Sequence, residues 1–222
     1  MSSALESVIL EPAEDADAVI IWLHGLGADG NDFVPIVPEL KLPTSHRIKF
    51  IFPHAPIRPI TINGGMEMRG WYDIADQQLR KRTDIEGIKE SAASIRALID
   101  AEIAGGIASE RIILAGFSQG GAVAYYLGLR IPERLAGIIA LSTYVPAADA
   151  LTDEINEHKD LPVFIAHGTH DPLVPEALGT SAKSSLAALG LNPSYQAYPM
   201  EHAVCLEEIR DIGEFIKQVL AN

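Results

Sequence analysis

The sequence predicts an α/β fold in which a mostly parallel central sheet is flanked by helices. Two observations indicate this class. Short apolar runs alternate along the chain with longer segments of helical periodicity. The runs are rich in β-branched residues and carry few charges, as is typical of strands buried on both faces of a sheet. Strands that alternate with helices pair in parallel through right-handed crossovers.

The apolar runs predict the strands. Ala18–Leu23 (AVIIWL) is the clearest, because it is uncharged and rich in β-branched residues. Similar runs cover residues 48–52, 111–115, 135–141 and 162–166, and residues 194–198 form a weaker candidate.

Helices are predicted where apolar residues recur at spacings of three and four. One such stripe follows a capping box at residues 83–86 (TDIE) and ends at Gly105-Gly106. Its members are Ile85, Ile88, Ala92, Ile95, Ile99 and Ile103. The last helix carries Leu206, Ile209, Ile212, Ile216 and Val219 at the same spacing. Residues 119–129 and 176–189 also fit helices.

We predict a single domain over residues 1–222, because no linker, repeat or low-complexity tract divides the chain. Residues 53–82 are an exception to the regular pattern. They contain several prolines, the pair Gly64-Gly65 and the basic cluster 80–82, which predict a long irregular insertion. Insertions of this length in compact domains are usually functional.

Charge and cysteine content narrow the class of protein. The chain has 30 acidic and 17 basic residues, a formal net charge of −13, which argues against nucleic acid or an anionic membrane as partner. Its one cysteine, Cys205, excludes an intramolecular disulfide. The N-terminal residues lack the basic region of a secretory signal, and the longest uncharged run, 112–129, is interrupted by glycines. We therefore expect a cytoplasmic protein without an integral membrane segment.

Residues 116–120 (GFSQG) match the motif G-x-S-x-G. The pentapeptide alone is common, but here it follows an apolar strand and precedes an uncharged helical stretch. On such a turn a serine is strained and projects its hydroxyl above the sheet edge as a nucleophile. Ser118 is therefore a candidate nucleophile. The alternative is a turn of small residues with a capping serine.

A serine nucleophile needs a base, and the base needs an orienting carboxylate. Asp171 and His202 each follow a predicted strand, in the order Ser, Asp, His that this motif requires. We predict Ser118, Asp171 and His202 as a triad. His158 lies in an acidic stretch and His167 ends a strand, so neither is favoured as the base. The backbone N–H groups of Leu26 and Gln119 are candidates for an oxyanion hole.

Three other kinds of site are disfavoured. Residues 25–30 formally match the dinucleotide motif G-x-G-x-x-G, but no acidic residue follows at the required distance and Pro35 and Pro38 interrupt the expected helix. Residues 167–171 (HGTHD) lack the spacing of a metal site. Cys205, at the start of the last helix, fits a small apolar residue better than a nucleophile. We expect no cofactor and no metal.

Seven motifs in register extend the pattern over nearly the whole chain. They are LHGLGADGNDF, FPHAP, WYD, GFSQGGA, LSTYVP, HGTHDPLVP and YPMEH. Together they resemble the acyl-protein thioesterase, lysophospholipase and bacterial carboxylesterase family of α/β-hydrolases. The resemblance implies an α/β-hydrolase fold without a large cap domain, and the same triad and oxyanion hole. It also implies that the insertion at about 57–82 lies beside an acyl-binding cleft, with Met66, Met68, Trp71, Leu173 and Val174 as candidate substrate-binding residues.

We therefore predict a serine hydrolase that cleaves carboxylic esters or thioesters of short to medium acyl chains through an acyl-enzyme. Lysophospholipids and acylated proteins are alternative substrates, because the same machinery serves them. A non-catalytic binding protein on the same fold is a remote alternative, since every candidate position is filled. A homodimer is one alternative for the oligomeric state. The family often has glycine before the catalytic histidine, whereas this chain has Glu201.

Overall fold

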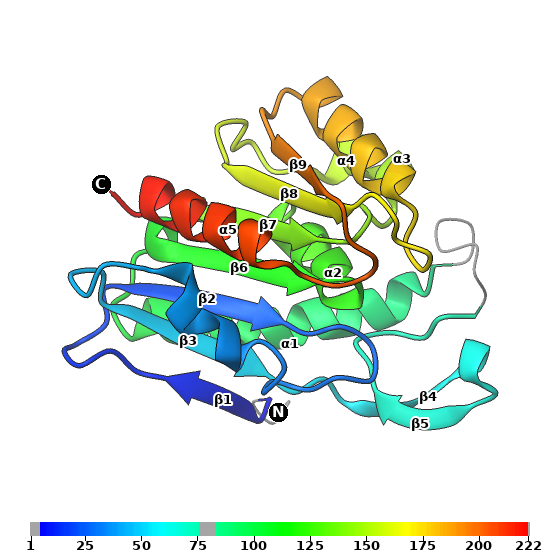
Figure 1. Cartoon of the computed structure of the whole chain (residues 1–222), viewed down its shortest axis with the longest axis horizontal. Helices are drawn as coiled ribbons and strands as arrows, with labels where there is room; N and C mark the ends of the chain where they lie inside the picture. Colours follow the sequence, from blue (N-terminus) through cyan, green and yellow to red (C-terminus); the bar gives the residue numbers. More distant parts are fainter. Residues whose placement is uncertain (1–4, 76–82, 222) are drawn as a thin grey trace.

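A computed structural model describes residues 5–75 and 83–221. In these ranges seven strands form one sheet in the order β1-β3-β2-β6-β7-β8-β9, and every neighbouring pair is parallel except β1 with β3. The strands are β1 (Ser7–Leu10), β2 (Ala18–Leu23), β3 (Ile48–Pro53), β6 (Ile112–Phe117), β7 (Gly137–Leu141), β8 (Val163–Gly168) and β9 (Ser194–Tyr198) (Figure 1). The predicted mostly parallel sheet is confirmed.

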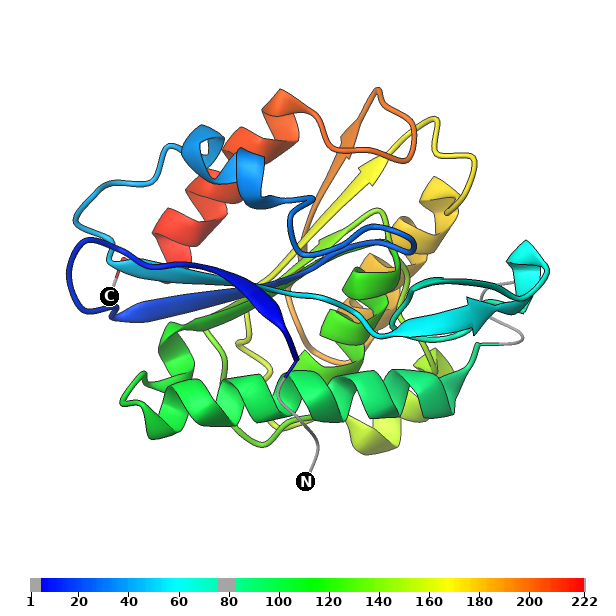
Figure 2. The ribbon, with the colours of Figure 1, turned by 90° about the horizontal axis from the view of Figure 1, so that it is seen from below.

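Helices cover both faces of the sheet, as the view in Figure 2 shows. The α-helices are α1 (Ile85–Ala104), α2 (Gln119–Gly128), α3 (Ala148–Glu154), α4 (Glu176–Ala188) and α5 (Leu206–Val219). The 3-10 helices are η1 (Val34–Leu40), η2 (Thr61–Asn63) and η3 (Ser109–Arg111). Buried side chains of α1, α2, α3 and α4 form the core on one face, and those of α5 and η1 form the core on the other. No helix in the described ranges is long and apolar enough to cross a bilayer.

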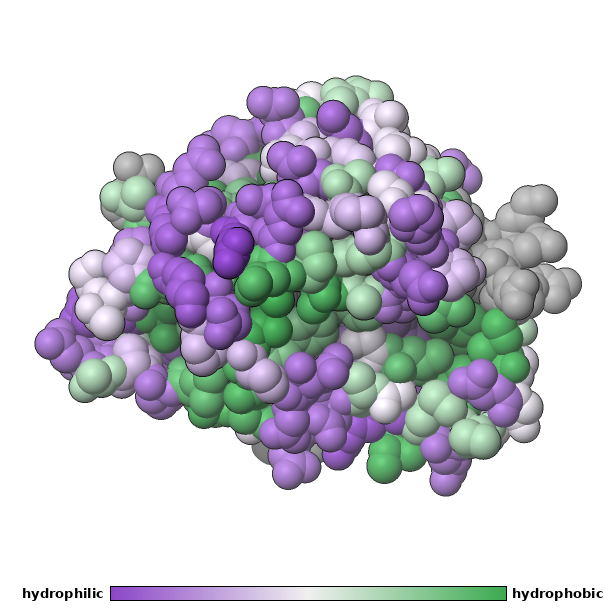
Figure 3. Space-filling model, viewed as in Figure 1, coloured by the Kyte–Doolittle hydropathy of each residue, from purple (hydrophilic) through white to green (hydrophobic). Residues whose placement is uncertain are grey.

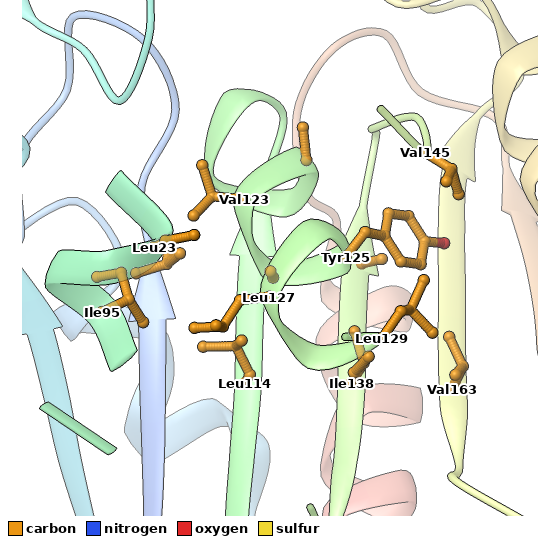
Figure 4. Close-up of a cluster of buried hydrophobic side chains, with 14 of the residues drawn as sticks. Leu23, Ile95, Leu114, Val123, Tyr125, Leu127, Leu129, Ile138, Val145 and Val163 are labelled. Atoms are coloured by element: carbon orange, nitrogen blue, oxygen red, sulfur yellow. The ribbon is translucent and has the colours of Figure 1, made fainter. Parts of the chain in front are cut away.

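Helix α2 is the buried centre of the first core. Figure 4 shows its side chains, among them Val123, Tyr125 and Leu127, between the helix and the strands beneath it. All three are less than a tenth exposed. A helix that is apolar on every side is stable only when it is covered on every side. The helix that follows the G-x-S-x-G motif is therefore fixed by packing on the sheet, on α1 and on the loops above it.

The insertion is more regular than predicted. Strands β4 (Ile57–Ile60) and β5 (Met66–Arg69) pair antiparallel in a hairpin that carries η2 at its turn. The prediction of an irregular segment was wrong here. Pro59 has no N–H group to donate, but a strand of a two-stranded hairpin has a free edge and tolerates a proline. The basic cluster 80–82 lies outside the described residues. Strand β1 and helix α3 were not predicted.

Helix α1 begins one residue later than the capping box predicts. Asp84, rather than Thr83, is the N-cap, and its carboxylate accepts a hydrogen bond from the Gly87 N–H at 2.9 Å. The same carboxylate accepts from the Asp73 N–H at 3.0 Å. The Asp84 side chain thus caps helix α1 and bonds the insertion at Asp73.

Helix α5 begins beside a buried carboxylate. Glu208 is fully buried, and its Oε2 accepts a long hydrogen bond of 3.4 Å from the Cys205 N–H. Its Oε1 has no partner in the described part of the chain. Burial raises the pKa of Glu208 to about 8, and the nearby Asp211 adds to the rise, while the Cys205 N–H acts in the opposite direction. The group is therefore neutral in the folded protein at mildly acidic pH.

We predict that Glu208→Gln stabilises the protein more at pH 9 than at pH 5. The folded pKa lies above the unfolded one, so the folded state binds more protons between the two values and the wild type loses stability as the pH rises through that range. Glutamine removes this loss, so its advantage in the free energy of unfolding should reach on the order of 3 kcal/mol at pH 9. Urea unfolding at both pH values measures it.

Glu207→Gln is the matched control, because Glu207 precedes Glu208 on the same helix and is exposed. It should change stability equally little at both pH values. An advantage of Glu208→Gln that is the same at pH 5 and pH 9 would contradict the prediction.

Candidate active site

Ser118 lies on the tight turn between β6 and α2. Its backbone has φ 54° and ψ −117°, in the left-handed half of φ that a residue with a Cβ rarely adopts. The two flanking glycines leave the space that this turn needs. A Cβ on Gly116 would lie 2.4 Å from the backbone of Gly120, and one on Gly120 would lie 2.4 Å from the Leu23 carbonyl oxygen. The motif is thus required by the close approach of α2 to the strands.

Asp171 and His202 meet although 31 residues separate them. His202 Nδ1 donates to Asp171 Oδ2 at 2.6 Å, while Asp171 Oδ1 accepts from the N–H groups of Leu173 and Val174 at 2.9 and 2.8 Å. The Asp171 side chain is fully buried and that of His202 is 13% exposed. A buried carboxylate with all its bonds satisfied in this way orients the imidazole and leaves Nε2 available as a base.

His167 lies behind this pair. It is fully buried, and its Nε2 donates to the Val174 carbonyl oxygen at 2.8 Å. Burial lowers the pKa of His167, so the ring stays neutral. His167 therefore holds the turn that carries Asp171, and it is not among the residues that line the cleft with Ser118. His170 is exposed, and within the described residues no cluster of His, Cys, Asp or Glu could hold a metal ion.

Two backbone N–H groups are available beside Ser118. Those of Leu26 and Gln119 donate to no other group within the described ranges. Gln119 is the first residue of α2, where the helix leaves N–H groups free and its dipole is positive. Leu26 follows β2, and both residues line the same cleft as Ser118 and His202. These are the two N–H groups that the sequence predicts for an oxyanion hole, and that role stays a prediction.

The loop that carries Leu26 is held by His24. The ring of His24 donates from Nδ1 to the Gly25 carbonyl oxygen at 2.7 Å and accepts at Nε2 from the Ala55 N–H at 3.0 Å. Burial lowers the pKa of His24, which keeps the neutral ring that can both donate and accept. Residues 25–30 continue into η1, a 3-10 helix, and not into the α-helix that a dinucleotide site needs.

The hairpin segment joins this loop to the nucleophile turn. The Trp71 indole N–H donates to the His24 carbonyl oxygen at 2.9 Å. The Gln119 side chain accepts from the Trp71 N–H at 2.7 Å and donates to the Tyr72 carbonyl oxygen at 2.6 Å. The Gly27 N–H donates to the Arg69 carbonyl oxygen at 2.8 Å. The insertion is therefore bonded both to the loop that carries Leu26 and to the Gln119 side chain beside Ser118.

The cleft has a volume of about 460 Å³. Apolar side chains dominate its walls, and the Tyr72 and Tyr144 hydroxyls, 2.9 Å apart, share a hydrogen bond in its buried part. Burial raises the pKa of both tyrosines, so both stay neutral. Figure 3 shows hydrophobic surface over the β4–β5 hairpin and η2. The lining residues are Gly25, Leu26, Ala28, Asp32, Ile62, Asn63, Tyr72, Ile74, Phe117, Ser118, Gln119, Tyr144, Leu173, Val174 and His202.

The structure places the predicted substrate-binding residues in two groups. Leu173 and Val174 lie on the cleft wall, whereas Met66, Met68 and Trp71 do not. Met66 is 64% exposed on the hairpin, and Trp71 is fully buried behind the Leu26 loop. A substrate-binding role for these three residues stays a prediction. Tyr72 and Tyr144 were missed as lining residues, although the motifs WYD and LSTYVP contain them.

Comparisons with known proteins place this geometry in a family. Residues 5–220 match the model of the phospholipase/carboxylesterase family. Acyl-protein thioesterase 1 of Schizosaccharomyces pombe is 41% identical over 100% of both chains. Acyl-protein thioesterase 1 of Neurospora crassa is 40% identical over 91% of this chain and 87% of its own.

Solved structures agree with the sequence relatives. The crystal structure of Arabidopsis thaliana SOBER1 superposes with a TM-score of 0.85 at 33% identity, over 91% of this chain and 99% of that one. Acyl-protein thioesterase 2 of Zea mays gives a TM-score of 0.85 at 29% identity, over 97% and 99%. The fold and the site define an α/β-hydrolase of the serine type that acts on carboxylic esters or thioesters. The chain belongs to the phospholipase/carboxylesterase family.

We predict that Trp71→Phe lowers kcat about tenfold and leaves KM nearly unchanged. The substitution removes the indole N–H and leaves the buried His24 carbonyl without its donor, which costs about 1–3 kcal/mol of stability. The loop that carries Leu26 is then less firmly placed, and small displacements of positioning groups reduce the rate strongly. Hydrolysis of p-nitrophenyl butyrate and urea unfolding measure the two effects.

Trp22→Phe is the matched control. Trp22 is equally buried, but its indole N–H has no partner in the described part of the chain, so the same substitution breaks no hydrogen bond. Its kcat should stay close to that of the wild type, because phenylalanine keeps an aromatic ring against Phe33, on which Trp22 stacks at 5.3 Å. Equal losses of kcat in the two variants would show that ring size, rather than the bond to His24, matters.

Proposed function

We propose that Ser118, His202 and Asp171 form the catalytic triad of this hydrolase. The observation that carries the proposal is the 2.6 Å hydrogen bond from His202 to the buried Asp171, on a cleft that Ser118 also lines. His202 Nε2 takes the Ser118 proton as Oγ attacks the acyl carbon. Asp171 holds the Nδ1–H tautomer and stabilises the imidazolium that forms.

The oxyanion that develops is bound by the N–H groups of Leu26 and Gln119, each worth about 3–4 kcal/mol to the transition state. When the intermediate collapses, His202 returns its proton to the leaving alcohol or thiol, and Ser118 keeps the acyl group. A water molecule, deprotonated by His202, then attacks the acyl-enzyme; as the bond to Ser118 Oγ breaks, His202 returns the proton to Oγ and the carboxylic acid is released. No cofactor takes part in these steps.

We propose acylated proteins as the substrate, carrying short to medium acyl chains in thioester linkage. The apolar cleft beside Ser118 suits an aliphatic acyl group, and the relatives named acyl-protein thioesterase favour a protein as the leaving group. Small esters and lysophospholipids are the alternatives that the same machinery would hydrolyse. The half-buried free thiol of Cys205, in a chain with no second cysteine, favours the cytoplasm.

Removing single groups of the proposed triad tests the mechanism. We predict that Ser118→Ala neither labels with a fluorophosphonate nor hydrolyses p-nitrophenyl butyrate. Asp171→Asn should lower kcat by on the order of 10³–10⁴, because the amide favours the wrong histidine tautomer. Initial rates and gel-based labelling measure both. Ser94→Ala, a half-buried serine of α1, is the control and should behave as wild type. Residual hydrolysis by Ser118→Ala at the wild-type rate would remove Ser118 from the mechanism.

Charge at the cleft should discriminate between thioesters. Asp32 is the one carboxylate among the described cleft-lining residues, and it is exposed in a protein of net charge −13. We predict that Asp32→Asn raises kcat/KM for a short acyl-coenzyme A, whose phosphates it repels, by about 3–5-fold at low ionic strength. The N-acetylcysteamine thioester of the same acid is uncharged and should respond little. Release of free thiol measures both substrates.

Glu110→Gln is the control for this test, because it removes one negative charge at the opposite end of β6 from Ser118. It should leave the ratio of the two substrates unchanged. The prediction fails if Asp32→Asn changes the two thioesters by the same factor, or if added salt does not reduce the difference.

A further inference from the structure

The His202 ring is held along one edge. Its Cγ is bonded to Cβ and its Nδ1 to Asp171 at 2.6 Å, so the ring can still tilt about the Cβ–Cγ bond as the hydrogen bond bends. A base must present Nε2 toward the nucleophile, so the plane of the ring matters as much as its position. A contact on the face of the ring would limit this tilt.

Phe117 provides a surface against the ring. It is the last residue of β6 and immediately precedes Ser118. The ring centroids of Phe117 and His202 are 4.7 Å apart, with 44° between the planes. This distance lies within the range of attractive aromatic contacts, and within the range at which an aromatic face stabilises a cation.

The Phe117 ring is itself supported from behind. Phe33 lies 5.7 Å from it, and Trp22 stacks on Phe33 at 5.3 Å with 25° between the planes. On another side, a Cβ on Gly25 would lie 3.2 Å from Phe117 Cδ1, so the ring closely approaches the backbone of the loop that carries Leu26. Trp22 and Phe33 are almost fully buried, which makes the column of rings a rigid backing.

We propose that Phe117 is a positioning residue for His202. Its ring sets the plane of the imidazole and stabilises the imidazolium that forms when Ser118 loses its proton. This role rests on the proposed triad. Of the charged and titratable groups in the described residues, Asp171 and His167 lie at the β8 end, Glu201 and Cys205 are near His202 in the sequence of its own loop, and Asp32, Tyr72 and Tyr144 line the same cleft. Of these, Asp171 alone bonds the ring within the described residues.

Phe117→Leu tests the proposal with p-nitrophenyl acetate, whose short acyl group needs little of the cleft. We expect kcat to fall about tenfold with KM nearly unchanged, because the imidazole is less well oriented. The acidic limb of the kcat/KM profile should move to lower pH by about 0.5 unit, since the protonated base loses a stabilising aromatic face. Phe117→Tyr keeps the ring and should restore both values.

Phe164→Leu is the matched control. Phe164 is 4% exposed and packs on Phe215 at 5.6 Å, near the start of β8 and away from His202. The Phe164→Leu substitution removes the same side-chain volume and a similar ring contact. The pH profile of this variant should be that of the wild type. The proposal is overturned if Phe117→Leu raises KM alone or leaves the acidic limb of the profile unmoved. It is also overturned if Phe164→Leu shifts that limb by the same amount.

Fluorophosphonate labelling separates this outcome from failure of the triad itself. A wild type that labels at Ser118, together with a Phe117→Leu variant whose profile does not move, overturns the role of Phe117 alone. A folded wild type that does not label removes the triad and the role of Phe117 with it.

Discussion

The close approach of α2 to the sheet is the constraint on which the site depends. Gly116 and Gly120 allow the helix to begin against the end of β2, where any side chain would meet backbone at 2.4 Å. In the turn between them Ser118 has a positive φ of 54°. The same geometry exposes the Gln119 N–H at the start of the helix. The positive φ of Ser118 and the unbonded N–H of Gln119 thus accompany one packing contact, which the buried, apolar α2 maintains.

The second half of the site depends on the insertion. The Gln119 side chain forms hydrogen bonds with the backbone of Trp71 and Tyr72, and the Trp71 indole N–H donates to the His24 carbonyl oxygen. The loop of Leu26 is therefore fixed between β2 and the hairpin segment. These groups are buried, so each unmade hydrogen bond would carry a desolvation cost. Trp71 therefore stabilises the loop at the cleft through a hydrogen bond, although its side chain does not line the cleft.

Several elements escaped prediction for identifiable physical reasons. Strand β1 has only four residues and is stabilised as an edge strand by its antiparallel partner β3. The β4–β5 hairpin contains Pro59 and polar residues, and it exists because its end is bound to the Leu26 loop and to Asp84. Local propensity is too weak a signal for such short elements, whose stability comes from tertiary contacts. The long periodic helices and the buried parallel strands were predictable, because burial of a helix face or of a whole strand requires apolar residues at a regular spacing that is visible in the sequence.

The sequence by itself determined the order of strands and helices, the mostly parallel sheet and the positions of Ser118, Asp171 and His202 just after separate strands. It did so because hydrophobic periodicity and the small-residue turn are local, and because the carboxyl ends of parallel strands meet at one edge. Only the tertiary structure decided that the Trp71 indole bonds the His24 carbonyl, that Tyr72 meets Tyr144, and that Phe117 faces His202. These contacts join segments that are distant in the chain, and their partners depend on how each side chain is oriented once the sheet and helices have packed.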